Sequence, residues 1–305
     1  MERREFIKSV GIAGMFSLLG TVPSRGLSNL STGPEKSRPE LLSGPFAVVF
    51  DPSGNLLVTD PSQYRVVCLD SNDKLLFSFG RPGSQPGMLN YPLGLATGSE
   101  GIIYVADSNN CRVQAFDSNG NVKRVIGSIG STAGSFANPQ SVTVDKAGRL
   151  LVADTRNHRI QIFQRGNLVG VIGELGDDDD QFRLPTEVVT RDSGEIVVLD
   201  SKHGLVKVFG EDLKFKHSFG GVGSNPGLFN MPQAMALDES GHIWVADTGN
   251  HRIQEFSPDG KVISVVGKVG AGAHEFRSPS GIAIHGQRVC VADNGNGRLQ
   301  YLERK

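Results

Sequence analysis

One pattern recurs six times between about residue 45 and residue 305, and it restricts the fold more than any other feature of the chain. Each copy ends a hydrophobic segment on Asp, and the next hydrophobic segment begins five residues later, in five copies on Arg. A period of 46 or 47 residues built from strand-type segments alone is typical of a β-propeller. The positions are Asp60, Asp107, Asp154, Asp200, Asp247 and Asp293, followed by Arg65, Arg112, Arg159, Arg252 and Arg298, with Leu205 in the fourth copy.

Each period has room for four strands. In the fifth copy these are residues 233–237, 243–247, 252–256 and 262–266, which are rich in Val, Ile, Phe and Trp and are bounded by short Gly, Asp and Asn turns. Helical spacing of apolar residues is absent beyond the N-terminal segment. The sequence therefore predicts an all-β protein of six four-stranded antiparallel blades, with inner strands starting near residues 45, 92, 139, 185, 232 and 279.

A second signature marks the connections between blades. Gly and Pro lie twelve positions apart in five linkers, as in Gly127 and Pro139, and each linker carries one large apolar residue. Because Pro restricts φ, it suits the start of each inner strand. We expect the apolar residues to fill the gaps between neighbouring blades; they are Leu89, Phe136, Phe182, Phe229 and Phe276.

The motifs P-S-G-I-A-I, V-A-D-T-x-N-H-R-I-Q and G-x-F-x-x-P resemble NHL repeats over about residues 27–305. The resemblance implies a six-bladed β-propeller. It does not single out one function, because NHL propellers serve as RNA readers, sensor domains, scaffolds and, in some cases, lyases.

The sixth copy ends after its third strand, so its fourth strand must come from elsewhere. Gly33 lies twelve residues before Pro45, the spacing of the other linkers, and Leu42 takes the place of the linker Phe. We therefore expect residues 27–32 to form the outer strand of the sixth blade beside residues 296–303, which closes the ring and covers an exposed strand edge.

Residues 1–26 have the features of an export signal. Arg3, Arg4, Phe6 and Lys8 match the twin-arginine motif, and a weakly hydrophobic stretch follows over residues 9–22. That stretch is shorter than the roughly 20 residues of a membrane-spanning helix. The prediction is a folded protein exported by the twin-arginine route to the periplasm or another extracytoplasmic place, alone or with a redox or membrane complex. An uncleaved signal anchor remains an alternative.

The charge and the cysteine content argue against several classes of protein. The 31 basic and 32 acidic residues give a net charge of −1, and no Lys/Arg-rich run follows the signal, which argues against nucleic-acid binding. The three cysteines form no CxxC or CxxCH motif, so no haem attachment or Cys-rich zinc site is expected. Cys68 and Cys290 belong to blades that become neighbours in a closed ring, where they could form a disulfide or remain buried thiols.

The repeated Asp and Arg residues are interpreted as structural, since they recur in nearly every blade: each Asp would accept turn N–H bonds and pair with its own Arg. The resemblance also allows one enzyme class to be tested. In the peptidyl-hydroxyglycine amidating lyases, His ligands of zinc directly follow the blade-opening Pro. No His stands there in this chain, which has Phe46, Leu93, Gln140, Thr186, Gln233 and Ser280.

Asymmetry gathers in the fourth copy. Its linker carries Asp177, Asp178, Asp179 and Asp180, its inner strand carries Glu187 where other copies have Ala, Gly or Ser, and its loop lacks Arg. We expect these carboxylates, with Lys202 and His203, to gather at one part of the channel mouth. They are weak candidates for a Ca²⁺ or Zn²⁺ site; a solvated acidic loop is the alternative.

The sequence favours a non-enzymatic module that binds a protein or peptide on one rim, with no predicted cofactor and no catalytic residues. Its rim candidates are Tyr64, Asn109, Asn110, Arg156, Asn157, Lys202 and His203. The alternative function is a metal-dependent hydrolase, lactonase-like or lyase-like, with its site at the channel mouth.

Overall fold

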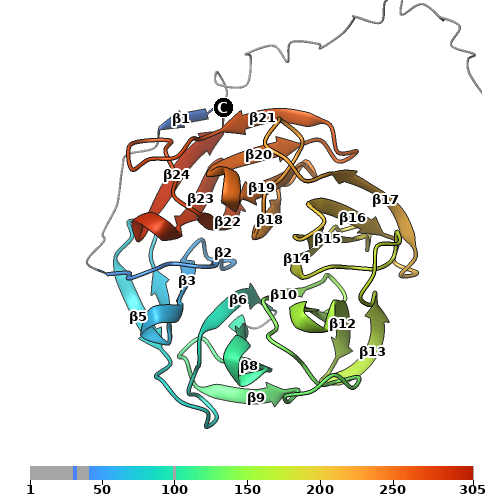
Figure 1. Cartoon of the computed structure of the whole chain (residues 1–305). Helices are drawn as coiled ribbons and strands as arrows, with labels where there is room; N and C mark the ends of the chain where they lie inside the picture. Colours follow the sequence, from blue (N-terminus) through green and yellow to red (C-terminus); the bar gives the residue numbers. More distant parts are fainter. Residues whose placement is uncertain (1–29, 33–40, 99–100, 305) are drawn as a thin grey trace, which may run out of the picture.

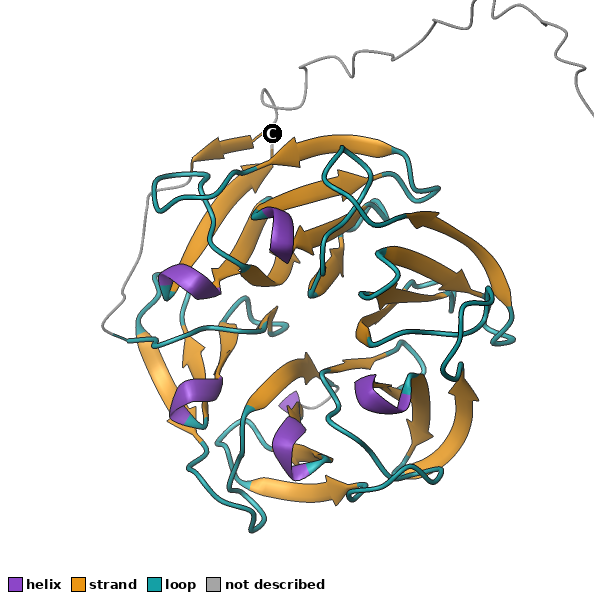
Figure 2. Cartoon of the chain, viewed as in Figure 1, coloured by secondary structure: helices purple, strands orange, loops and turns teal. Residues whose placement is uncertain are grey.

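The computed structural model describes residues 30–32, 41–98 and 101–304, which form six four-stranded antiparallel sheets arranged as blades around a central axis (Figure 1). In these residues the only helical segments are single 3₁₀ turns, so the protein is all-β, as predicted (Figure 2). No helix among them is long and apolar enough to cross a membrane. The proposed signal, residues 1–26, lies outside the described part.

The first three blades follow one another along the chain. Blade 1 contains β2 (Val48–Phe50), β3 (Leu56–Asp60), β4 (Arg65–Leu69) and β5 (Leu75–Phe79). Blade 2 contains β6 (Pro92–Thr97), β7 (Ile103–Asp107), β8 (Arg112–Phe116) and β9 (Val122–Ile126). Blade 3 contains β10 (Ser141–Val144), β11 (Leu150–Asp154), β12 (Arg159–Gln164) and β13 (Asn167–Ile172).

The last three blades complete the ring. Blade 4 contains β14 (Pro185–Thr190), β15 (Ile196–Asp200), β16 (Leu205–Phe209) and β17 (Phe215–Gly220). Blade 5 contains β18 (Ala234–Leu237), β19 (Ile243–Asp247), β20 (Arg252–Phe256) and β21 (Val262–Val266). Blade 6 contains β22 (Pro279–His285), β23 (Arg288–Asp293), β24 (Arg298–Arg304) and the N-terminal β1 (Leu30–Thr32).

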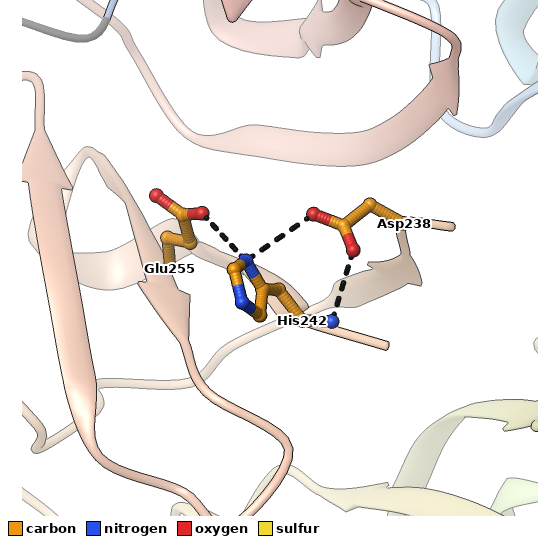
Figure 3. A group of neighbouring side chains, drawn as sticks. All are labelled: Asp238, His242 and Glu255. Atoms are coloured by element: carbon orange, nitrogen blue, oxygen red, sulfur yellow. Dashed lines mark hydrogen bonds and ion pairs between the residues drawn. The ribbon is translucent and has the colours of Figure 1, made fainter. Parts of the chain in front are cut away.

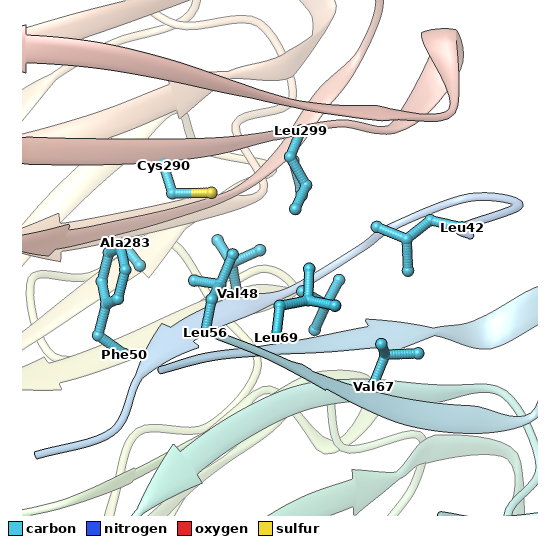
Figure 4. Packing of buried hydrophobic residues seen from close by; sticks show 11 residues of the cluster. Leu42, Val48, Phe50, Leu56, Val67, Leu69, Ala283, Cys290 and Leu299 are labelled. Carbon is cyan, nitrogen blue, oxygen red and sulfur yellow. The ribbon is translucent and has the colours of Figure 1, made fainter. Parts of the chain in front are cut away.

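The predicted closure of the ring is confirmed. β1 pairs antiparallel with β24, with Leu30 opposite Arg304 and Thr32 opposite Leu302. Leu42 then packs between the first and last blades with Leu69 of β4 and Leu299 of β24 (Figure 4). Residues 27–29 of the predicted strand lie outside the described part. The closure between the first and last blades therefore combines a short strand pairing with a continuous apolar core.

The linker residues fill the gaps between blades, as the sequence predicts. Phe136 is fully buried and packs with Val113 of blade 2 and Val152 of blade 3. Phe182, Phe229 and Phe276 are likewise fully buried, as is Leu89. Removing such large apolar surfaces from water is the main favourable term that holds the blades together.

The three cysteines are free and buried. Cys68 packs in the core between blades 1 and 2, whereas Cys290 packs in the core between blades 6 and 1. The two thiols thus lie on opposite faces of blade 1, and of the two alternatives left by the sequence the structure has the buried thiols.

Candidate functional site

Each repeated Asp is buried and ties the loop between the second and third strands to the preceding linker. In blade 2, Asp107 accepts hydrogen bonds from Arg112 Nε at 2.7 Å, from Asn110 Nδ2 at 2.8 Å and from the backbone N–H of Asn90 at 2.7 Å. Arg112 in turn donates to the carbonyls of Ser84, Gln85 and Met88. The carboxylate and the guanidinium are thus occupied within the protein. The same ion pair recurs at Asp60–Arg65, Asp154–Arg159, Asp247–Arg252 and Asp293–Arg298.

Blade 4 anchors its linker with different side chains. Leu205 stands where the Arg would be, and the cation near Asp200 is Lys207, whose Nζ lies 3.4 Å from the carboxylate and donates to the carbonyls of Asp178 and Gln181. Sequence reasoning missed Lys207. The signal was present, because Lys207 occupies the position that Gln holds in blades 2, 3, 5 and 6, in the only copy that lacks Arg.

His203 belongs to the same anchor. Its Nδ1 lies 2.6 Å from Asp200 Oδ2, and its Nε2 lies 2.9 Å from Asp177 Oδ1. Arg183 also donates to Asp177, at 2.7 Å from its Nε. The bonds from His203 and Arg183 lower the pKa of the Asp177 carboxyl. This carboxylate is therefore engaged by two cationic or polar side chains.

The structure does not bring the five candidate metal ligands of blade 4 together. Asp177 to Asp180 lie on the linker before Phe182, and none of them lines the channel cavity described below. Glu187 comes after Pro185 has turned the chain into the inner strand, and its carboxyl contacts the Ser141 hydroxyl of blade 3. The expectation that they share one part of the mouth is corrected: the linker and the inner strand direct them to different places.

A ring cavity of about 470 Å³ lies among the six inner strands. The second residue after each blade-opening Pro lies where neighbouring inner strands approach closely. At Gly94, an added Cβ would stand 2.5 Å from the carbonyl oxygen of Gln140. Five blades accordingly have a small residue at this position: Ala47, Gly94, Ser141, Ala234 and Gly281. Blade 4 alone has a long side chain there, Glu187, which lines the cavity.

The environment of Glu187 is unusual for a carboxyl group. Burial raises its pKa to about 8, and hydrogen bonds from the Ser141 hydroxyl and the Val188 N–H oppose this rise. At neutral pH the group is therefore mostly the uncharged acid. Many enzymes use carboxyls with raised pKa values as proton donors, but such a group is not by itself a catalytic set.

The seven rim candidates fall into two groups. Asn110 and Asn157 each donate to the Asp of their own loop and to a linker carbonyl, and His203 bridges two carboxylates as described. Their polar atoms are used to hold the loops. The side chains of Tyr64, Asn109, Arg156 and Lys202 are instead exposed to solvent.

Two of the exposed candidates line a second hollow, of about 320 Å³, at the rim of the channel. Arg156 and Asn109 are fixed there because their backbone N–H groups donate to the linker carbonyls of Ala137 and Asn90. Tyr91, which is 46% exposed, and Asn138 complete its outer edge. Both follow from the linker geometry, in which the residue before the blade-opening Pro has a positive φ of 56° at Tyr91 and 52° at Asn138. This rim hollow thus combines an aromatic ring, amides and a guanidinium.

One further group of possible ligands meets in blade 5. Ligand atoms of Asp238, His242 and Glu255 all lie within 4.8 Å of one another (Figure 3). Arg304 Nη2 lies 2.7 Å from Asp238 Oδ2, where a metal ion would have to compete with its charge. Asp238 and His242 also occupy the turn positions that the Asp145–Arg149 ion pair holds in blade 3. The group is best described as the same turn stabilised by other side chains.

The comparisons with known proteins agree with this architecture. The NHL repeat model matches residues 89–116, 136–163, 229–256 and 276–301, which belong to blades 2, 3, 5 and 6. Blade 4, where the anchor differs, is not among them. No curated protein sequence matches the chain.

Several solved structures share the fold at low sequence identity. A streptogramin B lyase matches with a TM-score of 0.65 and 13% identity over 92% of this chain and 99% of its own. A gluconolactonase from Xanthomonas campestris matches with a TM-score of 0.63 and 12% identity over 86% of each chain. An auxiliary nutrient binding protein from Bacteroides thetaiotaomicron matches with a TM-score of 0.66 and 12% identity, over 86% of this chain and 69% of its own. Enzymes and a binding protein thus share this fold.

Proposed function

We propose that this NHL-repeat six-bladed β-propeller is a binding module that holds a peptide segment of a protein partner in the rim hollow. The main support for the proposal is that some rim side chains are hydrogen-bonded within the protein and others are not. The repeated Asp and Arg residues are satisfied internally, whereas the Arg156 guanidinium and the Lys202 ammonium form no hydrogen bond or ion pair within the described residues. Arg156 lines the hollow, and Lys202 lies beside it, in the corresponding loop of the next blade. Their loops are held by backbone hydrogen bonds to the linkers, while their charged groups stay available for selective contacts.

Apolar residues on the same linkers support a protein partner. Each of four linkers presents one aliphatic side chain to solvent directly after the outer strand: Ile129 is 79% exposed, Leu175 59%, Val222 69% and Val269 60%. Aromatic residues, Arg and fixed amides are common at the centre of protein interfaces. The hollow contains all three.

We place the proposed binding module outside the cytoplasm. The twin-arginine motif at Arg3 and Arg4 supports export of the folded ring. The alternative function, a metal-dependent hydrolase or lyase, requires ligands that converge on one point. In the described part of blade 4 the carboxylates do not converge, so binding is the better-supported function.

A peptide-display selection on the purified ring would test the proposal, with the affinity of a selected peptide then measured by fluorescence anisotropy. We expect Arg156→Ala and Lys202→Ala each to weaken binding at least about fivefold, the range of a modest interface contact. Arg165→Ala and Lys214→Ala are matched controls, because both residues lie exposed on the turns at the opposite face. Peptides that bind equally well to both pairs of variants would disprove the rim site.

A further inference from the structure

The channel cavity has a chemistry that the rim hollow does not share. Its lining mixes apolar residues of the inner strands with polar ones such as Gln140 and Gln233, and the Glu187 carboxyl lies among them. No Lys or Arg side chain lines it. The cavity therefore holds no permanently positive side chain, which disfavours anionic ligands.

An aromatic side chain lies across the ring from Glu187. Phe46 precedes β2 of blade 1, and blade 1 stands opposite blade 4 around the axis (Figure 1). Phe46 lines both the channel cavity and the rim hollow and is partly exposed to them. An aromatic residue and a carboxyl on opposite walls of one cavity form a suitable setting for an organic cation.

We propose that the channel cavity binds a small organic cation, such as a quaternary ammonium compound, whose charge pairs with the Glu187 carboxylate and rests against Phe46. Binding removes the carboxyl proton, which passes to the buffer, and leaves an ion pair in the channel. This site goes beyond the proposed rim function and does not depend on it.

Release of the Glu187 carboxyl proton on binding gives a way to test the proposal. The pKa of Glu187 is raised to about 8 by burial, so at pH 7 a cation must displace a proton to form the pair. Of the strands packed against β14, β10 and β18 carry no titratable side chain. β15 carries only Asp200, which is bonded to His203 and Lys207, and β11 and β12 carry Asp154 and Arg159, which are paired with each other. The other titratable groups that line the cavity are Asp51 and His285 near its far end.

Choline and its uncharged isostere 3,3-dimethyl-1-butanol are the probes for calorimetric titration. Neither titrates between pH 6 and pH 9. We expect choline to bind at least about tenfold more tightly than the alcohol at pH 8.5. Its affinity should rise about tenfold from pH 6 to pH 7 and about fivefold from pH 7 to pH 8, then level off. Titrations at pH 7 in buffers of different ionisation enthalpy should show close to one proton released for each choline bound.

Variants separate the groups involved. Glu187→Gln should weaken choline binding at least about tenfold and remove its pH dependence, while leaving the alcohol unaffected. Phe46→Leu should weaken choline binding about fivefold. Glu211→Gln, the same change on an exposed turn of the same blade, should change nothing. A pH dependence that survives Glu187→Gln would show that the proton comes from another group, and would overturn the proposal.

Other results would also overturn it. Equal affinity of the wild-type protein for choline and the alcohol would mean that the cavity selects apolar shape alone. Absence of choline binding at pH 8.5 at millimolar concentration would exclude the site. If Glu187→Gln fails to fold, the pH profile and the proton release of the wild-type protein decide by themselves.

Discussion

Blades 4 and 5 use different side chains to compensate the buried Asp at the end of their second strand. In blade 5 the buried Asp247 is paired with Arg252, and Asn250 connects it to the carbonyl of Gly223. In blade 4 the buried Asp200 is paired with Lys207, and His203 connects it to the side chain of Asp177. The difference teaches that the fold requires a compensated carboxylate at this point but not a particular cation.

The inner strands of the same blades differ as well. Blade 5 has Ala234 in the position where neighbouring strands approach closely, and blade 4 has Glu187. One blade therefore follows the repeat at both the anchor and the channel, and the other departs from it at both. Four predictions test whether these departures are equivalent replacements or have a use of their own.

The largest effect is expected from removing the anchor cations. Arg252→Met should lower the free energy of unfolding by about 3–5 kcal/mol, because it leaves a buried carboxylate without its cation. Lys207→Met should cost less, about 2–3 kcal/mol, because His203 remains 2.6 Å from Asp200. Urea denaturation measures both, with the exposed Arg165→Met as control. Equal losses in the two blades would mean that His203 supports Asp200 no better than Asn250 and Gln254 support Asp247.

The next largest effect is a change in how the free energy of unfolding depends on pH. The folded-state pKa of Glu187 is raised to about 8 from a usual value of 4.5, so between these values the folded state binds the extra proton and stability falls as the pH rises. Glu187→Gln should therefore gain about 3 kcal/mol relative to the wild type between pH 5 and pH 8. Glu211→Gln should follow the wild type. A constant difference across this range would contradict the burial of the Glu187 carboxyl.

A smaller effect compares the two connecting side chains. His203→Ala and Asn250→Ala each remove one bond to the buried Asp and one to the linker, and each should cost about 1–2 kcal/mol. Thermal unfolding at pH 7.5 would show similar losses. If only the blade 5 variant is destabilised, His203 is free for a role in binding rather than in the anchor.

The smallest effect on stability is expected at the exposed rim. Arg156→Ala and Lys202→Ala should change the free energy of unfolding by no more than about 0.5 kcal/mol, because neither side chain is bonded within the described residues. A loss near 2 kcal/mol from either change would show that the residue holds the ring together, and would remove it from the candidate binding surface.

Much of the fold could be read from the repeat. The blade order, the inner-strand starts and the linker Phe positions follow from spacing along the chain, and the closure followed from Gly33, Leu42 and Pro45 matching that spacing. These features depend on interactions that every blade repeats, so six copies reinforce one another. The 3₁₀ turns in the loops were not predicted, because a loop of four residues is too short to show the spacing of apolar residues by which helical segments are recognised.

The candidate site could be read only in part. Asn109, Asn110, Arg156 and Asn157 all stand in equivalent loops, yet Asn110 and Asn157 bond to carbonyls 27 residues earlier in the chain, while Asn109 and Arg156 face solvent. Lys207 stands where other copies have Gln, which hinted at a different anchor, but its pairing with Asp200 emerges only from the structure.

The sequence by itself determined that this chain is a ring of six blades, how the ring closes and where each linker crosses between blades. The tertiary structure alone decided which polar side chains are used by the protein and which remain available to a ligand. It also separated Glu187 from Asp177 and Cys68 from Cys290. The reason is physical: strands and turns form between near neighbours, whereas hydrogen-bond satisfaction and burial depend on residues from other blades.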